Sequence, residues 1–134
     1  MIRKLLDHPL TRGLDLDSPE TTLLRIKIVQ SKKFLRKIYF EWYQHLLNNI
    51  ADSSKPALEL GSGGGFLGEL SQQIVTSDIF WLPNLDLVFD AQMMPFKCES
   101  LSSLMMVNVL HHIPDAEQFF QEAARCLEAG ATIT

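Results

Sequence analysis

Cysteine is scarce in this 134-residue sequence. Cys98 and Cys126 are the only two, and they form no CxxC or paired spacing. This indicates reduced thiols in a cytoplasmic protein rather than a disulfide framework. No apolar run reaches the roughly 18 residues that a membrane span needs. No long apolar stretch follows the basic start at Arg3 and Lys4, so we expect no secretory signal. With 46% hydrophobic and 21% charged residues, the composition is typical of a soluble globular protein.

Positive charge is rare in the larger part of the chain. Residues 1–55 hold ten of the 12 Lys and Arg residues and six of the 16 acidic residues, a net charge of +4. Residues 56–134 hold two basic against ten acidic residues, a net charge of −8. Four bases cluster beside a predicted helix: Lys32, Lys33, Arg36 and Lys37. They form either a solvated face or a patch for an anionic substrate, nucleic acid or lipid surface.

Two helices are predicted in residues 1–55, which we interpret as an N-terminal helical segment. Ser18 can cap a helix and Pro19 suits its first position, which predicts a helix over about residues 19–30. A second helix is predicted over 32–50, because apolar residues recur there at steps of three and four. These residues are Leu35, Ile38, Trp42, Leu46 and Ile50.

From residue 56 onward, short apolar runs alternate with helical stretches. Strands are predicted at 57–60, 74–77, 85–89 and 101–108, and a fifth begins at 131. Helices are predicted at 66–73 and 115–128, the second with Asp115 as N-cap and Gly130 at its C-terminal cap. Pro83 leaves no room for a full helix between the second and third strands. The alternation predicts an α/β domain over 56–134, an open parallel sheet with helices on both faces.

The first predicted strand runs into a loop with glycine at every second position, Gly61, Gly63 and Gly65. Glycine lets the backbone turn sharply and lets a ligand approach the main chain. Two ligands suit such a loop: a dinucleotide, whose pyrophosphate sits on the following helix end, and S-adenosylmethionine, whose amino-acid moiety packs on the glycines. Gly63, Gly65 and Gly68 satisfy G-x-G-x-x-G, so an NAD(P)-binding oxidoreductase is an alternative.

The position of the glycines relative to the strand favours S-adenosylmethionine. In a dinucleotide site the first glycine follows the strand directly. Here Gly61 has that place, and Gly63 comes two residues late. Glu59 near the strand end suits an ammonium-bearing ligand, whereas its carboxylate would repel phosphates.

With these residues the sequence resembles the class I methyltransferase family, which has a Rossmann-like fold. Glu59-x-Gly61-x-Gly63-x-Gly65 is similar to the first family motif. Further similar segments follow in family order and extend the resemblance over residues 57–134: Ser77-Asp78-Ile79, Asp90-Ala91-x-x-x-Pro95-Phe96, Asn108 to Asp115, and Glu122 to Gly130.

The resemblance implies S-adenosyl-L-methionine as cofactor and supplies a set of contact residues. Asp78 would bind the ribose hydroxyls and Asp90 the adenine amino group. The full set is Glu59, Gly61, Ser62, Gly63, Gly65, Asp78, Ile79, Asp90, Ala91 and Asn108. Short connections on both sides of Asp78 depart from the family pattern, so an ordinary loop acid is the alternative there.

His111 and His112 are the only candidates for a catalytic base. They follow the fourth predicted strand, at the edge where open parallel sheets place ligands. One could take a proton from the methyl acceptor, or both could simply shape the loop. Adjacent extended residues point to opposite sides, which also makes them a poor metal pair, and we expect no metal site. In the family an N-terminal helix can cover the cofactor, so Tyr39, Trp42 and Tyr43 either contact it or dock their helix.

The family sheet continues beyond its fifth strand, and the residues for that part are absent from this sequence. We expect a fragment of a longer protein, with a natural short form or a homodimer completed through the open sheet edge as alternatives. The predicted function is methyl transfer to an unidentified acceptor. The rivals are the oxidoreductase and a non-catalytic binding or assembly module.

Overall fold

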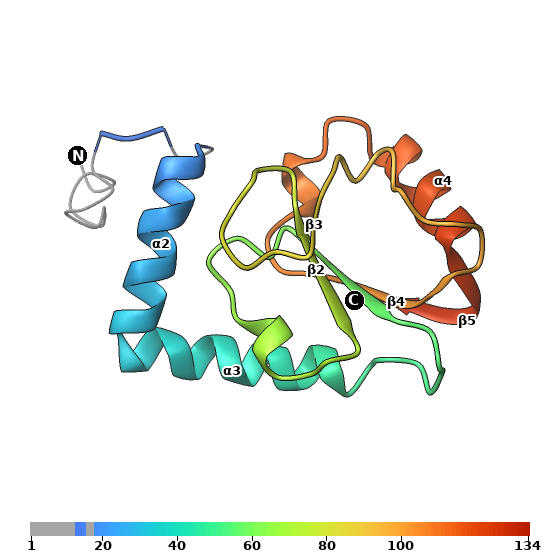
Figure 1. Ribbon diagram of the computed structural model, residues 1–134, viewed down its shortest axis with the longest axis horizontal. Helices are drawn as coiled ribbons and strands as arrows, with labels where there is room; N and C mark the ends of the chain where they lie inside the picture. The colour runs from blue at the N-terminus through green and yellow to red at the C-terminus, as the bar shows by residue number, and fades with distance from the viewer. Residues whose placement is uncertain (1–12, 16–17) are drawn as a thin grey trace.

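The computed structural model describes residues 13–15 and 18–134; residues 1–12 and 16–17 of the predicted N-terminal segment lie outside this range. Figure 1 shows two N-terminal helices beside a sheet that carries a third helix. The elements are α2 (Pro19–Ser31), α3 (Lys33–Leu47), β1 (Ala57–Leu60), the 3-10 helix η1 (Leu67–Glu69), β2 (Ile74–Asp78), β3 (Leu87–Val88), β4 (Leu101–Met106), the 3-10 helix η2 (Leu110–His112), α4 (Ala116–Cys126) and β5 (Leu127–Ile133).

The sheet has five parallel strands in the order β3-β2-β1-β4-β5, which confirms the predicted open parallel sheet. The central strand β1 pairs on both sides, with Ala57 opposite Ile74 in β2 and Ser103 in β4. Parallel strands all end at the same edge, here called the carboxyl edge. The loops after β1, β2, β3 and β4 therefore meet there.

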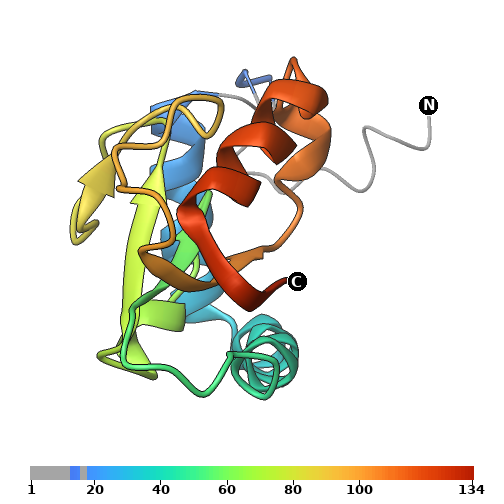
Figure 2. The ribbon, with the colours of Figure 1, turned by 90° about the vertical axis from the view of Figure 1, so that its right-hand side faces the viewer.

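Helices cover the two faces of the sheet, with α3 on one and α4 on the other, as Figure 2 shows with α3 seen end-on. Successive strand residues face opposite sides, so β1 sends Ala57 toward α3 and Leu58 toward α4. The buried cluster on the α3 side contains Val29, Tyr43, Leu46, Ala57, Phe66, Leu67, Ile74 and Met105. The cluster on the α4 side contains Leu58, Leu60, Met94, Leu101, Leu104, Phe119, Ala123 and Cys126.

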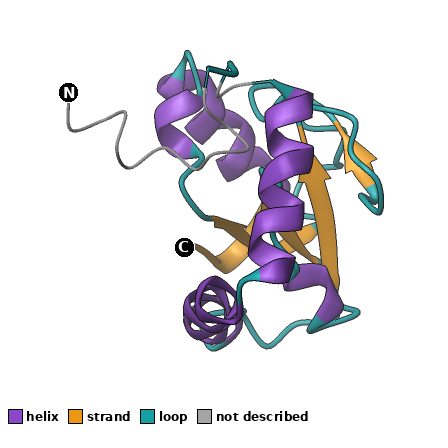
Figure 3. Ribbon diagram, turned by 90° about the vertical axis from the view of Figure 1, so that its left-hand side faces the viewer, coloured by secondary structure: helices purple, strands orange, loops and turns teal. Residues whose placement is uncertain are grey.

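The layer on the α3 side is built by the N-terminal helices rather than by crossover helices. The predicted helix at 66–73 is wrong, because only η1 forms in the β1–β2 connection. Four glycines at 63, 64, 65 and 68 disfavour a longer helix there. The β2–β3 connection has no helix, as Pro83 predicts. Figure 3 shows α2 and α3 beside the sheet.

The helix predicted over 115–128 ends earlier, and the strand after it starts earlier. Asp115 is the N-cap as predicted and accepts a hydrogen bond from the Gln118 amide at 3.0 Å. Backbone pairing with β4 then takes over from helical hydrogen bonding, and Leu127 lies opposite Leu101. Gly130 therefore lies inside β5 with φ +84°, next to a register shift, and not at a helix C-cap.

The first N-terminal helix begins as the sequence predicts. Ser18 accepts a hydrogen bond from the Thr21 amide at 3.2 Å, and Pro19 holds the first helical position. At Lys32 the backbone is extended, so α3 starts in a new direction (Figure 1). Of the three aromatic residues singled out on α3, Tyr43 is fully buried whereas Trp42 is 43% exposed.

Tyr43 packs directly beneath the glycine loop. Its hydroxyl accepts a hydrogen bond from the Phe66 amide at 3.3 Å, and its ring meets the Phe66 ring edge-on at 5.0 Å. A Cβ atom at residue 65 would overlap the same hydroxyl. Gly65 is therefore required by the approach of α3 to the loop.

We predict that Gly65→Ala lowers the free energy of unfolding by about 1–3 kcal/mol, the usual range for overpacking a core. Tyr43→Phe removes the hydroxyl that the new methyl group would overlap. The loss of unfolding free energy in the double variant should therefore be smaller than the sum of the losses in the two single variants. Urea unfolding of the four proteins measures the coupling. If the two losses simply add, a side chain at position 65 does not meet the Tyr43 hydroxyl.

Candidate functional site

Three acidic residues lie near the carboxyl ends of the neighbouring strands β1, β2 and β3, one for each strand. Glu59 and Asp78 are in β1 and β2 and are 3% and 8% exposed, whereas Asp90 lies in the loop after β3 and is exposed. Glu59 and Asp78 both belong to the sheet face that α3 covers. The buried part of the site is therefore acidic, which suits a cationic ligand or one that donates hydrogen bonds.

Asp78 is the last residue of β2 and is hydrogen-bonded to the glycine loop. Its Oδ2 accepts a hydrogen bond from the Gly63 amide at 2.9 Å, and its Oδ1 accepts one from the Phe80 amide at 3.0 Å. Each carboxylate oxygen can accept a further hydrogen bond. The short connections on either side of Asp78 therefore leave its carboxylate beside the loop.

Several amides of the glycine loop are already engaged within the protein. Besides the Gly63 amide on Asp78, the Gly65 amide donates to the Ser62 carbonyl at 2.7 Å and the Phe66 amide to Tyr43. The helix that follows, η1, has only three residues. A dinucleotide pyrophosphate needs free amides at the start of a longer helix, so this loop does not fit one.

Glu59 is held by a serine pair at the base of the loop. The Ser62 hydroxyl donates to Glu59 Oε2 at 2.7 Å, and the Ser77 hydroxyl donates to the Glu59 carbonyl at 2.8 Å. Burial raises the pKa of Glu59 from 4.5 to about 7, the Ser62 hydrogen bond opposes this, and the nearby Asp78 adds to it. Near neutral pH, Glu59 can therefore change its charge when a cation arrives.

Neighbouring segments pack tightly around the other glycines. Gly61 has φ +63°, and a Cβ there would overlap the side chain of Val109, which follows β4. At Gly64 a Cβ would lie 3.1 Å from the backbone nitrogen of Ile26 in α2. The loop thus lies between α2, α3 and the segment after β4, with no space for side chains at these positions.

The loop after β3 is fixed to α4 by hydrogen bonds from its main chain to an ion pair within that helix. Arg125 binds Glu122 through two hydrogen bonds of 2.9 and 2.8 Å and also donates to the carbonyls of Phe96 and Met94, while the Met94 amide donates to Glu122. The hydrogen bond from Arg125 lowers the pKa of Glu122. This arrangement holds residues 94–96, just beyond Asp90, against the helix.

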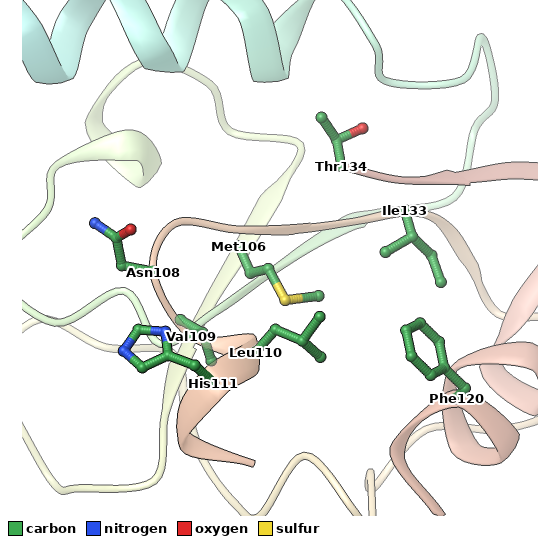
Figure 4. Close-up of a pocket in the computed structure, with 8 residues that line it drawn as sticks. All are labelled: Met106, Asn108, Val109, Leu110, His111, Phe120, Ile133 and Thr134. Carbon is green, nitrogen blue, oxygen red and sulfur yellow. The ribbon is translucent and has the colours of Figure 1, made fainter. Parts of the chain in front are cut away.

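A cavity of about 530 Å³ lies beyond the end of β4, between that strand, β5 and α4 (Figure 4). Its lining is mainly apolar and includes Met106, Leu110, Phe120 and Ile133, with Asn108 and His111 at one side. His112 is not among the lining residues, and its ring centroid is 4.0 Å from that of His111. Only one of the two histidines therefore lines the cavity.

The structure brings most of the predicted residues to the carboxyl edge of the sheet, but their side chains differ in how deeply they are buried. Glu59, Ser62 and Asp78 are buried around the glycine loop, whereas Ile79 is 61% exposed. Asp90 and Asn108 are exposed and Ala91 is half-buried. Sequence reasoning did not single out the contacts of Val109 with Gly61 or of Arg125 with the loop after β3. The one sequence signal for Arg125 is that it lies in the segment Glu122 to Gly130, which resembles the family.

Among the described residues, no helix is both long and apolar enough to cross a membrane. Within the same part of the chain, no group of three or more His, Cys, Asp or Glu side chains could hold a metal ion.

Comparison with known proteins places these features in a family. A family model described as a methyltransferase domain matches residues 58–134, more than half of the chain. A search of curated proteins finds no match. Solved structures share the fold, and one of them is a candidate S-adenosylmethionine-dependent methyltransferase from Methanococcus maripaludis. It has a TM-score of 0.66 and 15% identity over 90% of this chain and 67% of its own.

Two further structures are described as S-adenosylmethionine-dependent methyltransferases. The protein from Thermotoga maritima has a TM-score of 0.59 and 21% identity over 71% of this chain. The protein from Aquifex aeolicus has a TM-score of 0.55 and 17% identity over 68% of this chain. The chain spans only 49% and 62% of their respective lengths.

We predict that Glu59 makes stability depend on pH. Its folded pKa of about 7 exceeds the ordinary 4.5, so between these values the folded state holds a proton that the unfolded state has released. The free energy of unfolding therefore falls as pH rises through this window, by up to about 3 kcal/mol. Glu59→Gln removes this contribution.

Urea unfolding of both proteins at several pH values checks this prediction. The stability of Glu59→Gln relative to the wild type should increase from about pH 5 to about pH 8. Curves that stay parallel over this range would show that Glu59 ionises normally in the folded protein.

Proposed function

Because the chain belongs to the methyltransferase domain family, we propose that it binds S-adenosylmethionine at the carboxyl edge and takes part in transferring its methyl group to an acceptor. The observation that carries the proposal is the glycine loop, which is hydrogen-bonded to Asp78 and lies above the buried Glu59. The loop amides are turned inward and the surrounding side chains are acidic. Both features suit a cofactor that is cationic and has no phosphate.

The acidic residues would hold different parts of the cofactor. The free lone pairs of Asp78 can accept hydrogen bonds from the two ribose hydroxyls. Asp90 would accept from the adenine amino group, with Ile79 and Ala91 beside the ring. The amino-acid moiety would lie on Gly61, Gly63 and Gly65, next to Ser62 and Asn108, and its ammonium group would favour the ionised form of Glu59.

When bound, the cofactor would supply a methyl group on a positively charged sulfur, which a nucleophile attacks in line. The residues of this chain would mainly orient the two partners, since orientation accounts for much of the rate of such a step. Of the two histidines, His111 is the better candidate for accepting a proton, because it lines the cavity beyond β4. The methyl acceptor would be a molecule that reaches the carboxyl edge of the sheet.

The basic cluster on α3 bears on the acceptor. Lys33, Lys37 and Arg36 are exposed, although Arg36 also stacks on Phe66 and lies 3.4 Å from Glu69. An anionic acceptor would be attracted to this side of the molecule. A solvated helix face is the alternative explanation of the same charges.

We predict that the chain binds S-adenosylhomocysteine, the product form of the cofactor, and does not bind NAD. Asp78→Asn should weaken this binding at least tenfold, because the single amide oxygen cannot serve both the loop and the ribose. Glu41→Gln, which removes one exposed acid on α3, is the matched control and should bind normally. Titration calorimetry measures all three proteins.

Binding of NAD in place of S-adenosylhomocysteine would overturn the proposal in favour of an oxidoreductase. Equal affinity of Asp78→Asn and the wild type would show that the ribose contact is misplaced. Binding of the cofactor without methyl transfer to any acceptor tested would support a non-catalytic module.

A further inference from the structure

Gln92 links the loop after β3 to the start of α4 at the carboxyl edge. Its side-chain amide nitrogen donates to both carboxylate oxygens of Asp90, each at 3.2 Å, and its backbone amide donates to Oδ1 at 2.8 Å. Its side-chain oxygen accepts a hydrogen bond from the Asp115 amide at 2.8 Å, at the start of α4. Both ends of the side chain are thus used, one by the loop after β3 and the other by α4.

The position of Gln92 is itself fixed. Its carbonyl accepts a hydrogen bond from the Gln118 side chain at 3.2 Å, and Arg125 holds the carbonyls of Met94 and Phe96 a few residues later. An exposed aspartate would otherwise sample several rotamers, and ordering it on ligand binding would cost affinity. Here the carboxylate of Asp90 is oriented before any ligand arrives.

We propose that Gln92 is a positioning residue that sets the selectivity of the site for the 6-amino group of adenine, by holding the Asp90 carboxylate ready to accept from it. This inference rests on the proposed function, because the amino group belongs to the proposed cofactor. Glutamine is suited to the role by its chemistry, since it donates to Asp90 and accepts from Asp115 at once. Glutamate would keep the acceptor but lose the donor and repel Asp90.

The experiment compares two ligands by titration calorimetry on the full chain. They are S-adenosylhomocysteine and its deamino analogue, in which hydrogen replaces the 6-amino group. The ratio of the two dissociation constants measures selectivity for the amino group. A loss of general structure would weaken both ligands together and leave the ratio unchanged. The wild type should prefer the amino form about tenfold, as expected for a hydrogen bond to a charged group.

Three variants separate the roles of the residues. Gln92→Glu keeps the acceptor for the Asp115 amide and loses the donor to Asp90, whereas Gln92→Met loses both. Gln121→Met is the matched control, because it removes an exposed hydrogen bond to Glu117 within α4 and involves neither Gln92 nor Asp90. Asp90→Ala sets the ratio expected when the carboxylate is absent. Thermal unfolding by circular dichroism checks that each variant is folded.

We expect both Gln92 variants to lose at least about threefold of the wild-type ratio, and Gln121→Met to keep it. An unchanged ratio in Gln92→Glu and Gln92→Met, with a wild type that discriminates, would overturn this inference and leave the proposed function intact. A wild type that binds both ligands equally would contradict the role of Asp90 and hence of Gln92. A wild type that binds neither ligand would contradict the proposed function itself.

Discussion

The hydroxyl of Tyr43 occupies the space where a side chain at position 65 would lie, and much of the structure depends on this contact. The β1–β2 connection forms only the short helix η1, so it cannot cover the sheet by itself. Helix α3 covers it instead, with Tyr43 and Leu46 buried against Phe66 and Leu67. The same contact fixes the glycine loop, because Tyr43 accepts a hydrogen bond from the Phe66 amide. The N-terminal helices therefore belong to the packing that supports the glycine loop.

Electrostatics around the loop follow from this packing. Because α3 covers Glu59, the carboxyl group is nearly removed from water and its pKa rises to about 7. Asp78 stays close to the loop through the Gly63 amide. The turned-in amides remove the usual attraction of a glycine loop for phosphate, and the acidic groups favour a cation. Together they make the dinucleotide alternative physically unsuitable, although Gly63, Gly65 and Gly68 satisfy its pattern.

The parts of the fold that could be predicted are those governed by local sequence. The apolar run of β1 and the cap and proline that start α2 form as expected, since their signals lie within a few residues. The helix expected after Gly65 fails because four glycines disfavour it and because α3 already packs beneath the loop, whereas the cap expected at Gly130 fails because strand pairing decides the structure there. Tyr43 occupies the space beneath the glycine loop, and pairing with β4 draws residues 127–130 into a strand. In the same way the role of Gln92 depends on the approach of α4 to the loop after β3, which no local pattern encodes.

The central claim is that the glycine loop and the loop after β3 together form one cofactor site at the carboxyl edge. Amide hydrogen exchange with and without S-adenosylhomocysteine tests it most directly, because it reports each segment separately. Exchange should slow in residues 61–66 and in residues 90–92 when the ligand is bound, with little change in the middle of α4. Protection confined to other segments, or none in either loop at saturating ligand, would contradict it.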